Sequence, residues 1–316
     1  MSGNTSTTPV TTEKTFSNYN QEQGKAYAQG RSDYHPKLYQ YVIDIHTSTG
    51  GQSDSLLDVG CGPGNAARAL CPHFSHAIGL DPSEGMVATA RSIGGVTSTS
   101  EPIRYEVSTA EHLGTSLSQQ PIQDGSVDLI TAANSAHWFD MSQFWPTAAR
   151  VLKPGGSVIL WTTGKTDIHH SVPNAAAINS AMDQLEETQL KPFMARGNLM
   201  TRNRYLDLPM PWDLENPVPG FEEAEFVRKD WDPSENFLAH QPEMNLDLVE
   251  KMFGTMSPVV RWREAHPDAV GTEDDITKIY RRTIERLLHE AGVEKGKETI
   301  KVAMQAVVLV VKKKSQ

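Results

Sequence analysis

Residues 56–66 read LLDVGCGPGNA, and this stretch decides the fold. The apolar run over 56–59 is typical of a short buried strand. Three glycines follow at every second position, Gly60, Gly62 and Gly64, and a helical segment is expected directly after them. Glycine lets the backbone turn sharply and lets a ligand lie against it with no Cβ in between. A strand, a glycine turn and a helix predict the first unit of a doubly wound α/β nucleotide site.

An acidic residue ends the second apolar stretch, at the position where nucleotide-binding α/β folds place one. Asp81 ends a second apolar stretch, residues 77–80, and lies 21 residues after Gly60. Folds of this kind place an acid there to accept hydrogen bonds from ribose hydroxyls. The sequence therefore predicts that Asp81 holds the sugar of a nucleoside ligand.

Two strings carry a family resemblance. The first, DVGCGPG from Asp58 to Gly64, resembles motif I of the class I S-adenosylmethionine-dependent methyltransferases, whereas dinucleotide enzymes usually carry the third glycine one place later. The second, AHWFD over 136–140, resembles the branch of that family that includes the trans-aconitate methyltransferases of fungi and bacteria. A dinucleotide oxidoreductase stays the rival at the level of the fold.

The resemblance implies an α/β fold: a Rossmann-like seven-stranded mixed sheet whose last strand lies antiparallel beside the fifth, with an inserted helical cap. It implies S-adenosyl-L-methionine as the cofactor. In the family, an acid often stands in the place of Thr109 and receives the adenine amino group, so here the Thr109 hydroxyl, Glu111 or a backbone carbonyl substitutes. The residues expected to bind the cofactor are Tyr27, Asp58, Gly60, Cys61, Gly62, Gly64, Asp81, Pro82, Met86, Thr109, Ala110, Glu111, Asn134 and His137.

Three further residues are candidates for the acceptor side. His137 and Trp161 are expected at the carboxyl ends of the fourth and fifth strands, where open sheets bind ligands. Arg31 lies in an aromatic N-terminal segment that, by resemblance, folds over the methionine end of the cofactor. A guanidinium can bind both oxygens of a carboxylate.

Composition limits the class of protein. The chain has 316 residues, a formal net charge of −10 and two cysteines, Cys61 and Cys71. These features argue against a nucleic-acid partner and suit a reducing cytoplasm. We find no apolar run long enough to span a membrane and no apolar signal core at the N-terminus. The expected partner is a small-molecule substrate, and the expected state is a monomer or a homodimer.

Strand–helix alternation breaks after about residue 163, which divides the chain. The insertion is rich in Pro, Asn and Met, and long insertions of this kind are often functional. Its side chains would suit an anionic or planar substrate: the cationic ones are Lys191, Arg196, Arg202 and Arg204, and the aromatic ones are Phe193, Tyr205 and Trp212. The predicted parts are a disordered N-terminus (1–15), a lid and helix (16–46), the cofactor-binding core (47–165), a cap insertion (166–220) and the rest of the sheet with a helical substrate-side insertion (221–316).

The predicted reaction is in-line transfer of a methyl group from a sulfonium to a small organic acid or a metabolite hydroxyl. A carboxylate acceptor needs no base, whereas for a phenol, enol or amine His137 is the candidate base. No metal is predicted, because the adjacent His169 and His170 have no partner motif. Two alternatives remain open: cyclisation or rearrangement of a substrate without methyl loss, and a module that binds the cofactor without catalysis.

Overall fold

The computed structural model describes residues 16–30, 33–115, 117, 120–231, 237 and 243–315. A seven-stranded mixed sheet forms its centre, in the order β3-β2-β1-β4-β5-β9-β6. The first five strands are parallel, whereas β9 runs antiparallel between β5 and β6. The predicted fold class and the place of the last strand are therefore confirmed.

Strands and helices largely alternate along the described chain up to β5, and helices predominate after it. The helices are α1 (Gln21–Gly30), α2 (Pro36–Ser48), α3 (Asn65–Leu70), α4 (Glu84–Ile93), α5 (Met141–Val151), α6 (Ala175–Leu185), α7 (Arg196–Arg202), α8 (Leu246–Gly254), α9 (Ser257–Ala265) and α10 (Ile276–Glu290). The strands are β1 (Ser55–Val59), β2 (His76–Asp81), β3 (Arg104–Val107), β4 (Val127–Ala133), β5 (Leu152–Ile168), β6 (Val227–Trp231), β7 (Met244–Asn245), β8 (Thr299–Ile300) and β9 (Val302–Lys312).

Two apolar layers cover the sheet. Strand side chains alternate between its faces, so Leu56 packs with α2, α3 and α4, while Leu57 packs with α5. Residues 205–220 of the expected cap insertion lie with α5 on the second face, because Tyr205, Leu208 and Met210 join its core. Only the earlier part of that insertion is available to cover the carboxyl ends of the strands.

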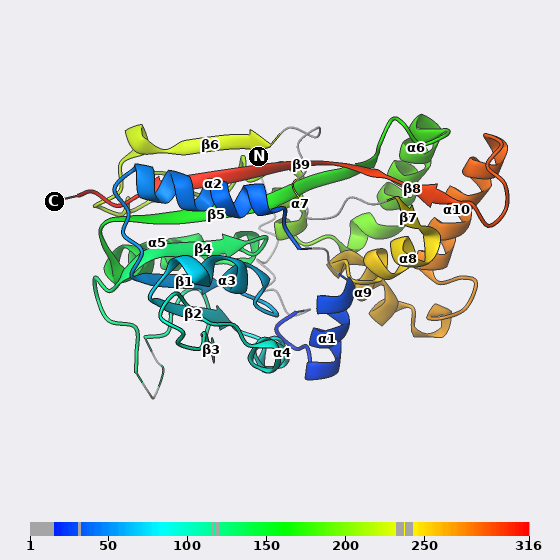
Figure 1. The fold of residues 1–316 in the computed structure, drawn as a ribbon. Helices are drawn as coiled ribbons and strands as arrows, with labels where there is room; N and C mark the ends of the chain where they lie inside the picture. The colour runs from blue at the N-terminus through cyan, green and yellow to red at the C-terminus, as the bar shows by residue number, and fades with distance from the viewer. Residues whose placement is uncertain are drawn as a thin grey trace, which may run out of the picture.

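The fifth strand is longer than its apolar run indicates. We expect it to end near residue 162, yet it continues to Ile168 because β9 pairs with it, from Ser157 opposite Lys312 to Ile168 opposite Val302. The two strands leave the sheet together and reach the helices grouped at the right of Figure 1. This extension connects the core to the cap.

The cap combines two stretches that are distant in sequence. Helix α6 packs with α8 and α10 around Ile178, Val249 and Ile284, and Figure 1 shows these helices side by side. The sheet order reverses between β1 and β4, which is where such sheets bind ligands. Among the described residues, no helix has both the length and the apolarity that crossing a membrane requires.

Helix α1 packs against α4 through two glycines with almost no space between the backbones. A Cβ on Gly85 would lie 2.2 Å from the carbonyl oxygen of Tyr19, and one on Gly24 would lie 2.8 Å from the carbonyl oxygen of Gly85. Real Cβ atoms do not approach backbone this closely, so the N-terminal segment fits only while both positions are glycine.

We predict that Gly85→Ala displaces residues 16–30 from α4, although alanine normally favours a helix. Overpacking of this kind costs about 1–3 kcal/mol. Hydrogen exchange followed by mass spectrometry should show faster exchange in α1 and unchanged exchange in the sheet. Gly254→Ala is the matched control, because its Cβ would meet only the Arg263 side chain, at 3.3 Å. Equal protection of α1 in both variants would contradict the prediction.

Candidate functional site

The glycine loop after β1 forms one wall of a cavity of about 910 Å³. Gly60, Gly62 and Gly64 all have positive φ angles, of 63°, 53° and 86°. At Gly60 a Cβ would lie 2.6 Å from the Cβ of Ser135, so glycine also allows the loop to pack beside the end of β4. A Cβ on Gly62 would meet nothing within 4 Å, which leaves this part of the loop open to a ligand.

The Asp81 carboxylate joins this loop to the end of β2. Its Oδ2 accepts a hydrogen bond of 2.9 Å from the backbone N–H of Gly62, and its Oδ1 accepts one of 2.9 Å from Ser83. Burial raises the pKa of Asp81 to about 6, while these two N–H groups favour the ionised form. The side chain lines the cavity, so its remaining lone pairs can accept hydrogen bonds from a ligand.

The part of the lining next to the end of β2 includes the residues that follow β3, and it contains several of the predicted cofactor residues. The Thr109 hydroxyl is 3.0 Å from Nδ1 of His112, and Oε1 of Glu111 accepts a hydrogen bond of 2.9 Å from the backbone of Asp140. The cavity lining in this region includes Pro82, Met86, Thr109, Ala110 and Glu111.

The loop after β4 carries His137, which contacts the hydroxyl of a buried tyrosine. Nδ1 of His137 lies 2.9 Å from the hydroxyl of Tyr205, which is 2% exposed. Arg204 and Tyr205 both have positive φ angles, of 51° and 59°, so a strained turn brings Tyr205 beneath the imidazole. Burial lowers the pKa of His137 to about 3, so this ring is neutral at physiological pH.

The N-terminal segment covers the same cavity. Phe16 and Tyr27 both line it, with ring centroids 5.7 Å apart, and Phe16 lies 6.3 Å from the ring of Trp138. The N-terminal segment and the glycine loop therefore line the same cavity, and the role of this segment as a lid stays a prediction. The prediction for Arg31 falls outside the described residues.

The comparisons with known proteins agree with this geometry. Residues 57–160 match a family model described as a methyltransferase domain. A Dictyostelium discoideum protein named as a methyltransferase is 32% identical over 158 residues, which are 50% of this chain and 54% of the relative. CRG1 of Saccharomyces cerevisiae, named as a probable S-adenosylmethionine-dependent methyltransferase, is 27% identical over 135 residues, 43% of each chain. This chain carries a class I S-adenosylmethionine-dependent methyltransferase domain.

A solved structure supports the fold beyond the matched region. The structure, described as a type II methyltransferase from Anaeromyxobacter dehalogenans, superposes with a TM-score of 0.59 at 20% identity, covering 89% of this chain and 97% of that one. The chain spans about half the length of the curated relatives that it matches. This superposition shows that the fold of the chain is that of the solved α/β structure.

The methyltransferase domain places most of the predicted cofactor residues on the cavity wall. These are Tyr27, Gly60, Cys61, Gly62, Asp81, Pro82, Met86, Thr109, Ala110, Glu111, Asn134 and His137. Asp58 and Gly64 do not line it, which corrects the prediction that both contact the cofactor. Asp58 is fully buried behind the loop and accepts a hydrogen bond of 2.7 Å from Thr131, and Gly64 is the residue before α3.

The prediction that Trp161 faces the cleft is wrong. Its side chain is completely buried on the α2 face of the sheet and does not line the cavity. Residue alternation along β5 decides which face a side chain occupies, and the apolar run alone does not reveal it. Tyr34, which packs edge-on against Trp161 with centroids 5.7 Å apart, is the aromatic residue that lines the cavity.

The expected cationic lining of the cap insertion is also wrong for three of its four residues. Lys191 pairs with Glu187, and Nη1 of Arg204 lies 3.5 Å from Asp230, while Arg196 also lies outside the lining. Only Arg202 lines the cavity. The sequence analysis did not predict the methionines that line this part of the cavity, although the insertion is rich in methionine.

The described residues contain one group of metal-ligating types whose ligand atoms lie within 4.8 Å of one another: Glu285, His289 and Glu298. Nε2 of His289 lies 2.6 Å from Glu298, and none of the three lines the cavity. We therefore interpret this group as a surface ion pair near the end of α10.

The pKa of His137 predicts how folding stability depends on pH. Below about pH 6.5 the unfolded chain protonates this histidine, whereas the folded chain does not until about pH 3. The contribution of His137 to the free energy of unfolding should therefore fall by up to about 1.4 kcal/mol for each pH unit of acidification in that window. In urea denaturation at pH 7, 6 and 5, the free energy of unfolding of His137→Asn should fall less steeply with acidification than that of the wild type. His73→Asn, at an exposed histidine, should keep the wild-type slope; identical slopes in all three proteins would contradict the assignment.

Proposed function

We propose that this protein transfers a methyl group from S-adenosylmethionine to a small-molecule acceptor. One observation carries the proposal: the cavity is continuous from the glycine loop and Asp81, past His137, into the cap. Its volume of about 910 Å³ is at the upper end of the range for small-molecule sites. A cofactor and an acceptor can therefore lie end to end in one cavity.

The cofactor occupies the end between the loop and β3 in this proposal. Asp81 accepts hydrogen bonds from the ribose hydroxyls, because its carboxylate is fixed at the cavity wall by Gly62 and Ser83. Met86 and Ala110 form the apolar sides of an adenine site. The lid residue Tyr27 then covers the methionine end, where Arg31 remains a predicted partner of the carboxylate.

His137 lies between this end and the cap. The transfer is an in-line displacement, in which an acceptor lone pair forms a bond to the methyl carbon and the sulfur keeps the electrons of the breaking C–S bond. Enclosure aligns the three atoms and excludes water. The protein then releases S-adenosylhomocysteine and a methylated acceptor.

The structure limits the form of base catalysis that His137 can provide. A base with a pKa of about 3 cannot ionise a phenol before attack, which narrows the role that the sequence suggests for it. The neutral ring can still accept a hydroxyl proton as the new O–C bond forms, because the acceptor oxygen becomes strongly acidic at that moment. A carboxylate acceptor would have no proton to lose.

The relatives named as methyltransferases support catalysis over passive cofactor binding, although the matched regions cover about half of their length. The net charge of −10 disfavours nucleic acid as the acceptor. The trans-aconitate branch, the cytoplasmic location and the monomeric or homodimeric state remain predictions from the sequence.

Two measurements test the proposal. Isothermal titration with S-adenosylmethionine should show binding, and incubation with methyl-labelled cofactor and a panel of phenols and organic acids should release S-adenosylhomocysteine as label enters the acceptor. Binding followed by a new product without S-adenosylhomocysteine would indicate cyclisation or rearrangement. Binding without any turnover would favour a cofactor-binding module, and failure to bind would overturn the proposal.

We predict that Asp81→Asn weakens binding of S-adenosylmethionine about 10- to 100-fold, the value of a charge-assisted hydrogen bond. Wild-type affinity should also fall between pH 7 and pH 5, because the carboxyl takes up a proton near pH 6. Asp44→Asn is the matched control, since it makes the same change on the exposed side of α2. Equal affinities in the two variants would exclude Asp81 from the cofactor site.

A further inference from the structure

The cap end of the cavity has a different lining from the cofactor end. We call this part the acceptor chamber, and its large apolar side chains from the cap include Met182, Met194, Met252, Phe253, Met256 and Tyr280. They come from α6, from the turns before α7 and α9, and from α8 and α10. Met304 of β9 adds a further apolar side chain from the strand that reaches the cap.

Methionine dominates this lining. Seven of the eleven methionines of the chain line the cavity, and only Met86 among them belongs to the predicted adenine site. Methionine is unbranched and polarisable, so it adapts to irregular apolar shapes and makes favourable contacts with aromatic rings. The rings of Phe253 and Tyr280, with centroids 5.1 Å apart, extend the same kind of surface.

The charged residues of the chamber are already paired with one another. Nζ of Lys165 lies 2.7 Å from Asp183 and 3.0 Å from Asp167. Arg202 pairs with Glu186. Among the residues that the structure describes at this end of the cavity, three carboxylates stand against two cations, so an anionic acceptor would find each cation occupied and an excess of negative charge.

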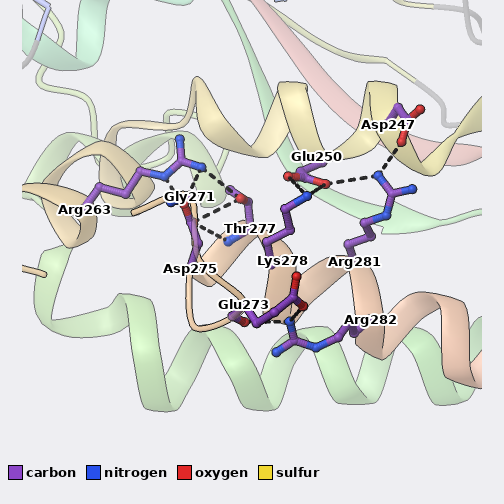
Figure 2. A network of polar contacts seen from close by, with 10 residues as sticks. All are labelled: Asp247, Glu250, Arg263, Gly271, Glu273, Asp275, Thr277, Lys278, Arg281 and Arg282. Atoms are coloured by element: carbon purple, nitrogen blue, oxygen red, sulfur yellow. Dashed lines mark hydrogen bonds and ion pairs between the residues drawn. The ribbon is translucent and has the colours of Figure 1, made fainter. Parts of the chain in front are cut away.

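The walls of the chamber are held by a polar network that joins α8, α9 and α10. Asp275 accepts hydrogen bonds of 3.1 and 2.9 Å from Arg263, which joins the start of α10 to α9. On the same helix, Lys278 and Arg281 each lie 3.1 Å from Glu250 of α8. Figure 2 shows these contacts in a row along α8, α9 and α10. They connect the helices that carry Phe253 and Tyr280 to one another.

We propose that the acceptor is a largely apolar, uncharged molecule with an aromatic or similar flat ring, methylated on a hydroxyl group. The inference deepens the proposed function and rests on it. In the step, the hydroxyl oxygen forms a bond to the methyl carbon, the C–S bond breaks toward sulfur, and the hydroxyl proton leaves to the neutral imidazole of His137 and then to solvent. A small polycarboxylate such as trans-aconitate has no free cation to bind in the described chamber.

The test compares two probes on the full chain saturated with S-adenosylhomocysteine. By isothermal titration, 2-naphthol should bind at least tenfold more tightly than trans-aconitate, and with methyl-labelled S-adenosylmethionine it should be methylated faster. If trans-aconitate is the better ligand, or if neither probe binds while the cofactor does, the inference is overturned and the proposed function stands. Failure to bind S-adenosylmethionine overturns both.

Variants locate the binding in the chamber. Met182→Gln combined with Met252→Gln keeps side-chain length and makes two walls polar, so 2-naphthol binding should weaken about tenfold. Met182→Leu with Met252→Leu keeps the apolar surface, and binding should stay within threefold of wild type. Cofactor affinity should be unchanged in both pairs, which also verifies folding. Equal losses of 2-naphthol binding in the two pairs, or no loss in either, would place the probe elsewhere and overturn the inference.

Discussion

The hydrogen bond from the Gly62 N–H to the Asp81 carboxylate is the interaction on which the site depends. It connects the turn after β1 to the end of β2, beside the backbone hydrogen bond of 2.9 Å from Cys61 to Leu80. Two neighbouring strand ends thereby become one rigid surface. A buried carboxylate is stable only when donors surround it, and here the donors are the backbone N–H groups of Gly62 in the glycine loop and of Ser83. The same hydrogen bonds therefore hold the loop in place and favour the ionised form of Asp81 at the cofactor end.

The paired extension of β5 and β9 has the corresponding role at the acceptor end. Beyond Thr163 the two strands extend past the rest of the sheet and remain paired through Thr166 and Ile168. They therefore reach the helices of the cap as a two-stranded extension. The two helical stretches of the cap, α6–α7 and α8–α10, are far apart in sequence and meet around this extension. Their facing side chains complete a cavity that neither stretch could enclose alone.

The cofactor end and the acceptor end of the cavity are lined by different kinds of residue. The cofactor end presents a fixed carboxylate and a turn of glycines at positive φ, which suit a ligand of constant structure. The acceptor end presents flexible methionines with its charges paired internally, which suits an apolar ligand of less defined shape. His137 stands between them, neutral and held by Tyr205 from below. A neutral, desolvated His137 ring can lie between the cofactor end and the apolar acceptor end, whereas a protonated ring would be unfavourable there.

The amino-acid sequence by itself determined the strands, the glycine loop, Asp81 and the family, because these depend on local patterns: apolar runs, glycine spacing and an acid at a strand end. Only the tertiary structure decided the rest. Trp161 is buried because of the face it occupies on β5, Arg202 and Lys191 are neutralised by carboxylates on nearby helical turns, and Tyr205 reaches His137 from 68 residues away. Such properties depend on contacts between segments distant along the chain or on side-chain pairing, which no local pattern encodes.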